Sequence, residues 1–168
     1  MERKSREMNT KINISSKQKL FKIPSQWKTL VKNACKTTLI AENFLEDTEI
    51  NVTFVDDNEI KQINCDFRNI DSSTDVLSFP LGDDGVYEVN PENNYVLLGD
   101  VIISVEHAMA QAELFGHGID REIAYLTVHS VLHLLGYDHV NSEEERKDMR
   151  KREEIVLKTM GLQIRKED

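Results

Sequence analysis

Three histidines, His129, His133 and His139, stand in the order H-x3-H-x2-G-x2-H, and this spacing constrains the chain more than any other feature. In an α-helix, residues four apart lie on the same face, so His129 and His133 can share one ion. Gly136 lets the chain leave the helix through a left-handed turn, which can carry His139 back toward them. Three neutral imidazoles leave a fourth position open for water or substrate, as in catalytic zinc sites. The pattern therefore predicts one catalytic Zn²⁺ ion, with another divalent transition metal as the alternative.

Apolar residues around this motif recur with the two periods that are typical of strands and helices. We expect strands near residues 12–14, 48–55, 76–79 and 96–104. We expect helices near residues 25–44, 59–67, 104–115, 120–135 and 142–160, with Ser25 as the cap of the first and Ile60, Ile63 and Phe67 on one face of the second. Interleaved elements of this kind predict an α+β fold, in which a mixed sheet of about four strands packs with about five helices. We expect one helix of this fold, metzincin-like in its histidine spacing, to carry the metal ligands.

The length of 168 residues suits a single domain. We assign residues 11–168 to one metal-dependent hydrolase domain and residues 1–10 to a basic, flexible N-terminal extension. Residues 1–22 contain seven Lys or Arg and two Asp or Glu, although the whole chain has a net charge of −9. This basic start is either a solvated tail or an arm that contacts an anionic partner.

The N-terminal residues show no apolar stretch typical of a secretory signal, and the two cysteines, Cys35 and Cys65, form no CxxC pair. We therefore expect a cytoplasmic protein with two idle thiols. No apolar run approaches the ~20 residues that cross a bilayer. The net negative charge argues against a protein that coats nucleic acids non-specifically. We expect neither a membrane nor DNA as a partner.

The histidine spacing matches the metzincin protease pattern H-E-x-x-H-x-x-G-x-x-H at every position except one. Ser130 occupies the position of the glutamate that acts as general base in those proteases. A serine hydroxyl does not accept a proton from a metal-activated water at neutral pH. This substitution argues against a protease, although a protease with its base elsewhere stays an alternative.

Residues 127–139 resemble the signature of the YbeY family, bacterial endoribonucleases of ribosomal RNA maturation, which runs close to H-G-x-L-H-L-x-G-Y-D-H. Two further segments are similar to this family: residues 64–80, with the arginine Arg68 and the block TDVLSFP, and residues 98–104, LGDVIIS. The resemblance spans roughly residues 49–161. The chain departs from the family pattern at three positions, Ser130 for glycine, Phe67 for tyrosine and Ser73 for proline.

The resemblance implies that His129, His133 and His139 bind zinc and that Arg68 is a catalytic residue in the cleft beside them. A guanidinium can hold two phosphate oxygens and stabilise the charge that grows during phosphodiester cleavage. The implied activity is single-strand-specific RNA cleavage in ribosomal RNA maturation, near the 3′ end of the small-subunit (16S) RNA, with a role in ribosome biogenesis and quality control. Implied partners are ribosomal RNA and the ribosome or a ribosomal protein, which would deliver the RNA despite the acidic surface.

Several alternatives stay open at this point. Arg68 could instead form a surface ion pair with Asp66 or Asp71. Asp138 could orient a ligand histidine or serve only as a turn residue, and Asp75 could cap a strand or hydrogen-bond near the site. His107 and His117 are expected to be satisfied core residues. A non-catalytic ribosome-assembly factor, in which the metal mainly stabilises the fold, is the alternative to an enzyme.

Overall fold

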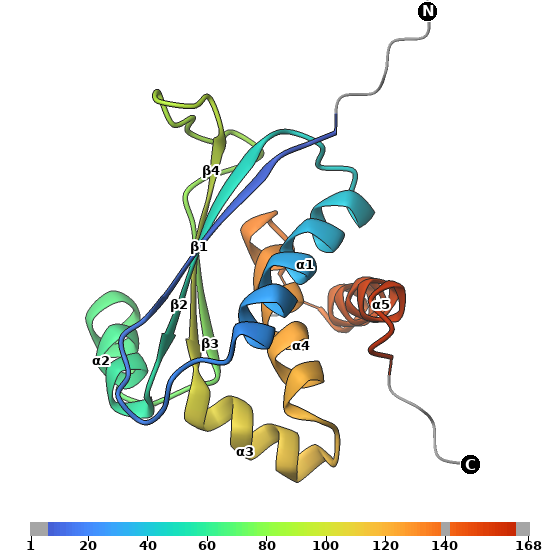
Figure 1. The fold of residues 1–168 in the computed structure, drawn as a ribbon. Helices are drawn as coiled ribbons and strands as arrows, with labels where there is room; N and C mark the ends of the chain where they lie inside the picture. Colours follow the sequence, from blue (N-terminus) through green and yellow to red (C-terminus); the bar gives the residue numbers. More distant parts are fainter. Residues whose placement is uncertain (1–6, 139–141, 164–168) are drawn as a thin grey trace, which may run out of the picture.

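The computed structural model describes residues 7–138 and 142–163 and contains a four-stranded sheet with helices on both sides (Figure 1). The elements in chain order are β1 (Thr10–Ser16), α1 (Ser25–Ala41), β2 (Thr48–Val55), α2 (Asp57–Arg68), β3 (Val76–Pro80), β4 (Val96–Ser104), α3 (Val105–Phe115), α4 (Ile119–Leu134) and α5 (Glu143–Thr159). The expected α+β architecture is confirmed, including its mixed sheet of four strands and its five helices within the described residues.

The sheet has the strand order β1-β2-β4-β3. The strands β1, β2 and β4 are parallel to one another, and β3 runs antiparallel to β4 at one edge. The register of β2 against β4 shifts at Glu49/Ile50, where Ile50 pairs with Gly99. Gly99 has φ +154°, and a Cβ atom there would lie 2.4 Å from the carbonyl oxygen of Phe79. This position therefore requires glycine, because β3 and β4 approach each other too closely for a side chain.

Helices α1 and α4 lie side by side on one face of the sheet, α5 packs outside them, and α2 lies on the opposite face (Figure 1). Apolar residues from the sheet and from these two inner helices form the main core cluster, which includes Val31, Phe54, Val101, Leu126 and Leu134. A second cluster joins α4 to α5 through Val128, Leu132, Met149, Val156 and Leu157. Helix α4 is consequently buried along most of its length, which holds it firmly in the centre of the molecule.

Local signals set most of the helix boundaries. Three helices begin with side-chain caps, in which Asp56 accepts from the N–H of Glu59 (2.8 Å), Ser104 from that of His107 (3.3 Å) and Ser142 from that of Glu145 (3.1 Å). The expected cap at Ser25 is wrong. Pro24 occupies the cap position with an extended backbone and no side-chain hydrogen bond, so that Ser25 is already the first helical residue. Helix α1 also ends earlier than expected, at Ala41, because Asn43 adopts φ +56°.

Phe67 does not share the burial expected of the apolar face of α2. Ile60 is fully buried, whereas Phe67 is 74% exposed and packs edge-on against the ring of Phe79, with the centroids 5.7 Å apart.

Residues 1–6 of the expected N-terminal extension lie outside the described residues. Within the described part of that segment, Met8 packs into the main core cluster and Thr10 begins β1. Both cysteines are free thiols, Cys35 buried and Cys65 half-buried. In the ranges 7–138 and 142–163, none of the helices has the length and apolar character needed to cross a membrane.

Candidate metal centre

The last two turns of α4 bring two of the three motif histidines together. The Nε2 atoms of His129 and His133 are 3.0 Å apart, and the ring centroids lie 4.6 Å apart at an interplanar angle of 80°. Helical geometry alone accounts for this pairing, because the residues are four apart. His139, the third predicted ligand, lies outside the described residues. Among the described residues, no group of three His, Cys, Asp or Glu side chains lies close enough to hold a metal ion.

The Nδ1 atoms of both rings are engaged with acceptors. The Nδ1 of His133 donates to the carbonyl oxygen of Tyr137 at 2.8 Å, and the Nδ1 of His129 donates to a carboxylate oxygen of Glu153 in α5. Because a backbone carbonyl can only accept, the proton of a neutral His133 resides on Nδ1, and its Nε2 presents a lone pair. The same reasoning applies to His129. Two imidazole lone pairs that face one another fit a shared cation, and the acceptors behind them are those that usually orient metal-binding histidines.

A cluster around Tyr137 holds the carbonyl that orients His133. The Tyr137 hydroxyl donates to a carboxylate oxygen of Glu42, at the end of α1, over 2.7 Å. Arg152 of α5 donates to the same oxygen over 2.7 Å, and its guanidinium lies 4.5 Å from the centroid of the Tyr137 ring. Burial and the hydrogen bond to Glu42 both raise the pKa of Tyr137. Glu42 and Arg152, from the end of α1 and from α5, thus fix the segment that follows α4, shortly before His139.

The two histidines line a cavity of about 670 Å³ between α4 and the β3 edge of the sheet. The cavity is lined by Arg68, Thr74, Asp75, Val76, Ser78, Pro80, Tyr125, His129, His133, Gly136, Tyr137 and Asp138. Most of these residues can form hydrogen bonds, and the edge strand and α4 supply both walls. Two segments that lie far apart in the sequence, residues 68–80 and 125–138, therefore contribute to one polar cleft.

Arg68 lines this cavity, where the family resemblance places it. Its Nη2 donates to the carbonyl oxygen of Ser78 at 2.7 Å, and its guanidinium lies 5.3 Å from the centroid of the Phe79 ring. The alternative of an ion pair with Asp66 or Asp71 is not seen within the described residues. Instead, Asp66 accepts from Gln62, and Asp71 pairs with Lys61. The strand β3 therefore anchors the guanidinium in the cavity that the two histidines also line.

Ser130 occupies the position at which the protease pattern has its general-base glutamate. It is fully buried, it does not line the cavity, and its hydroxyl has no hydrogen-bond partner within the described residues. The position between the two histidines therefore faces the core of the molecule.

Two aspartates considered in the sequence also line the cavity. Asp75 accepts from the N–H of Val76 at 2.7 Å and from the amide of Gln111 at 3.3 Å, so it is hydrogen-bonded at the cleft. Asp138 also contributes to the wall of the cavity. His107 and His117 are each paired with a carboxylate, at 2.5 Å from Asp57 and 2.6 Å from Glu122, and lie outside the cavity.

Glu153 and Tyr125 are the main site residues that sequence reasoning missed. Glu153 is an acidic residue at a buried position of α5, four residues after the buried Met149 and three before Val156. That placement on an otherwise apolar face was the available signal. Tyr125 lies one turn before His129, with the ring centroids 5.8 Å apart. Burial, followed by the charge of Glu153, raises the pKa of Tyr125.

The sequence of this chain matches the profile of a known protein family, described as endoribonuclease YbeY, over residues 13–161. The chain belongs to the endoribonuclease YbeY family. The matched range contains both described histidines, Arg68 and Glu153. The resemblance inferred from the three sequence segments is therefore confirmed.

Curated YbeY relatives share much of their sequence with this chain. The endoribonuclease YbeY of Caldanaerobacter subterraneus subsp. tengcongensis is 50% identical over 139 residues, which cover 79% of this chain and 87% of the relative. That of Clostridium botulinum (strain 657 / Type Ba4) is 43% identical over 164 residues, covering 90% and 98%. The solution structure of TM1509 from Thermotoga maritima has a TM-score of 0.56 and 28% identity, and covers 89% of this chain and 91% of its own.

Proposed function

We propose that this protein is a zinc-dependent, single-strand-specific endoribonuclease that acts in ribosomal RNA maturation. Membership in the endoribonuclease YbeY family supports hydrolysis of RNA phosphodiester bonds. One structural observation carries the rest of the proposal: two oriented imidazoles and an anchored guanidinium line the same polar cavity. We further propose that the cleavage point lies near the 3′ end of the small-subunit RNA, and that this cleavage contributes to ribosome biogenesis and quality control.

In this proposal, His129 and His133 present their Nε2 atoms to the ion, and His139 supplies the third nitrogen. When bound, zinc supplies a Lewis acid that polarises a phosphoryl oxygen. Glu153 and the carbonyl of Tyr137 keep the two imidazoles in the required tautomer and orientation, because each accepts the Nδ1 proton. Another divalent transition metal would suit the same nitrogens, so the identity of the ion belongs to the proposal.

Arg68 binds the scissile phosphate in this proposal. A guanidinium has five N–H donors, and among the described residues Arg68 commits one of them to Ser78. That bond and the Phe79 ring fix the position of the side chain before RNA arrives. A pre-positioned permanent cation stabilises the negative charge that develops on the phosphoryl oxygens.

The decisive experiment compares two variants of the purified protein on a single-stranded RNA. We expect His133→Ala to lose bound metal and cleavage together. We expect Arg68→Ala to retain its metal and to lose about 10²–10³-fold in kcat, which is typical for removal of one group that stabilises a developing oxyanion. Arg146→Ala, an exposed arginine on α5, is the matched control and should cleave normally. Full RNA cleavage by the Arg68 variant would contradict its proposed role.

The cellular part of the proposal has a separate test. Mapping of RNA ends in cells depleted of the protein should show that precursors accumulate at the 3′ end of the small-subunit RNA. We propose that the ribosome or a ribosomal protein presents this RNA, because the chain has a net charge of −9. If the isolated protein tightly bound and cleaved arbitrary single-stranded RNA at physiological salt, that result would argue against such delivery.

A further inference from the structure

Positive charge is concentrated in one part of this acidic protein. Residues 8–41 contain seven lysines and no aspartate or glutamate, whereas the whole chain has a net charge of −9. Lys11 and Lys36 form ion pairs, with Glu49 at 3.5 Å and Glu7 at 3.2 Å. Five other lysines, Lys32 among them, are exposed and form no ion pair within the described residues. We call the four that lie on the loop between β1 and α1 or in the first turn of α1 the basic surface: Lys17, Lys19, Lys22 and Lys28.

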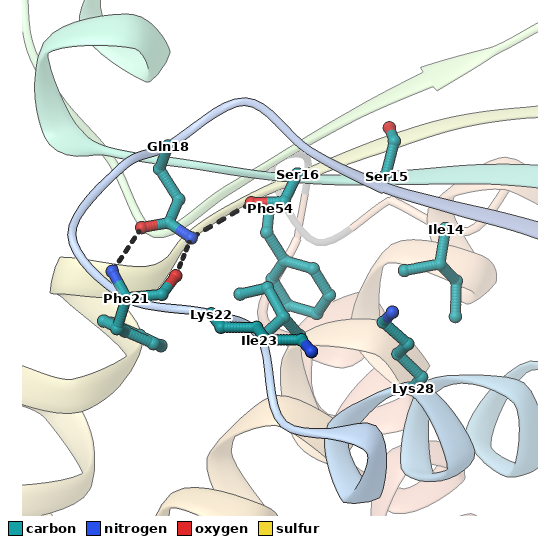
Figure 2. Close-up of a pocket in the computed structure, with 9 residues that line it drawn as sticks. All are labelled: Ile14, Ser15, Ser16, Gln18, Phe21, Lys22, Ile23, Lys28 and Phe54. Carbon is teal, nitrogen blue, oxygen red and sulfur yellow. Dashed lines mark hydrogen bonds between the residues drawn. The ribbon is translucent and has the colours of Figure 1, made fainter.

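The loop between β1 and α1 that carries three of these lysines is held by specific hydrogen bonds. The backbone N–H of Lys17 donates to the carbonyl of Phe54 at 2.8 Å. The amide of Gln18 donates to the carbonyl of Phe21 at 2.6 Å and to the hydroxyl of Ser16 at 3.0 Å (Figure 2). Its oxygen accepts from the N–H groups of Leu20 and Phe21. The basic surface is therefore built on an ordered scaffold, and binding would require little further ordering of the backbone.

A cavity of about 280 Å³ lies within the basic surface, between this loop, β1 and the first turn of α1. Figure 2 shows the ammonium groups of Lys22 and Lys28 directed toward the space between the loop and α1. Ser16 also lines the cavity, and its hydroxyl accepts from Gln18, whereas the Ser15 hydroxyl points away from the two lysines and pairs with Thr53; none of the lining residues is acidic (Figure 2). Two cations directed into one cavity repel each other unless an anion joins them. Lysine ammonium groups are common donors to nucleic-acid phosphates.

We propose that the basic surface is a second RNA-binding surface, which holds the sugar–phosphate backbone of the substrate away from the catalytic cavity. It lies at the β1 edge of the sheet, whereas the catalytic cavity lies at the β3 edge. Three strand spacings separate these edges, which places the two surfaces at least about 14 Å apart. One or two nucleotides in the catalytic cavity would therefore not reach the basic surface, but a larger folded RNA would. This inference rests on the proposed function, because it assigns the substrate of the same enzyme.

The test compares Lys17→Gln/Lys22→Gln/Lys28→Gln with a control that has the same change in charge, Lys147→Gln/Lys151→Gln/Lys158→Gln on α5. The control lysines are exposed and, within the described residues, form no ion pair. Binding is measured by fluorescence anisotropy on an RNA hairpin with a single-stranded tail and on the tail alone, between about 50 and 200 mM salt. We expect the first variant to lose about 10–50-fold in affinity for the hairpin near physiological salt, and its log–log salt slope to fall by about 2. The control and the isolated tail should show no such change.

Cleavage separates a binding role from a structural one. The basic-surface variant, Lys17→Gln/Lys22→Gln/Lys28→Gln, should have a higher KM for the tailed hairpin. Its kcat, and all its parameters for the isolated tail, should be unchanged. Equal salt slopes for the wild type and the basic-surface variant would overturn the proposal, and so would equal losses in the basic-surface variant and the control. Binding of polyglutamate instead of RNA, with the same dependence on these lysines, would overturn it in favour of an acidic protein partner. If the wild type binds the hairpin through these lysines but cleaves no RNA, the proposed function fails and the binding surface stands.

Discussion

The contact between Glu153 and His129 gives the most direct test of the metal centre. The Glu153 side chain is only 6% exposed, and one of its carboxylate oxygens accepts the Nδ1 proton of His129. Glu153→Gln keeps the size and one acceptor oxygen but removes the negative charge that increases the basicity of the ring. Loss of such an outer partner typically weakens metal binding by about 10–100-fold, which corresponds to roughly 1.4–2.7 kcal/mol. We expect a loss in this range.

Zinc affinity is measured by competition against a fluorescent chelator, with the fold checked by circular dichroism. Glu154→Gln is the matched control, because it lies next to Glu153 on α5 but pairs with Arg121 instead of a histidine. Wild type and control should bind zinc equally. Zinc affinity within twofold of wild type in a folded Glu153→Gln variant would refute the reasoning that this carboxylate orients and polarises His129.

Three further predictions concern stability and reactivity. Gly99→Ala should destabilise the fold by about 2–4 kcal/mol in urea unfolding, because its Cβ meets a backbone carbonyl of β3; Gly118→Ala, where a Cβ meets nothing within 4 Å, should cost much less. Hydrogen bonds from Asn90 and then Asn13 lower the pKa of Glu49, so its contribution to stability is present above its ordinary value of 4.5 and is lost as the pH falls through the lowered pKa. Glu49→Gln should flatten the pH dependence of unfolding in that acidic range. Burial raises the pKa of Cys35 to about 12, so a thiol reagent at neutral pH should label Cys65 in the native protein and Cys35 only after unfolding; native labelling of Cys35 would contradict its burial.

Local sequence signals were sufficient for much of the fold. The alternation in residues 48–55 predicted β2 with its correct bounds, and the caps at Asp56 and Ser104 are hydrogen bonds to N–H groups three residues later in the sequence. These features depend only on residues that are close in sequence, so each can be predicted from its own short segment. The error at Ser25 has the same origin. A serine before an apolar helical pattern is a good cap candidate. Here, however, Pro24 is the extended residue that precedes the helix, so Ser25 falls inside it.

The sequence by itself determined that His129 and His133 would meet, because the period of an α-helix places residues four apart on one face. It also placed Arg68 with them, through resemblance to a family. Only the tertiary structure decided what surrounds these residues. Glu153 reaches His129 across 24 residues, Glu42 reaches Tyr137 across 95, and the carbonyl that anchors Arg68 belongs to a neighbouring strand. Contacts of this kind follow from how α1, α4, α5 and β3 pack, and no local periodicity encodes which side chains will face one another after that packing.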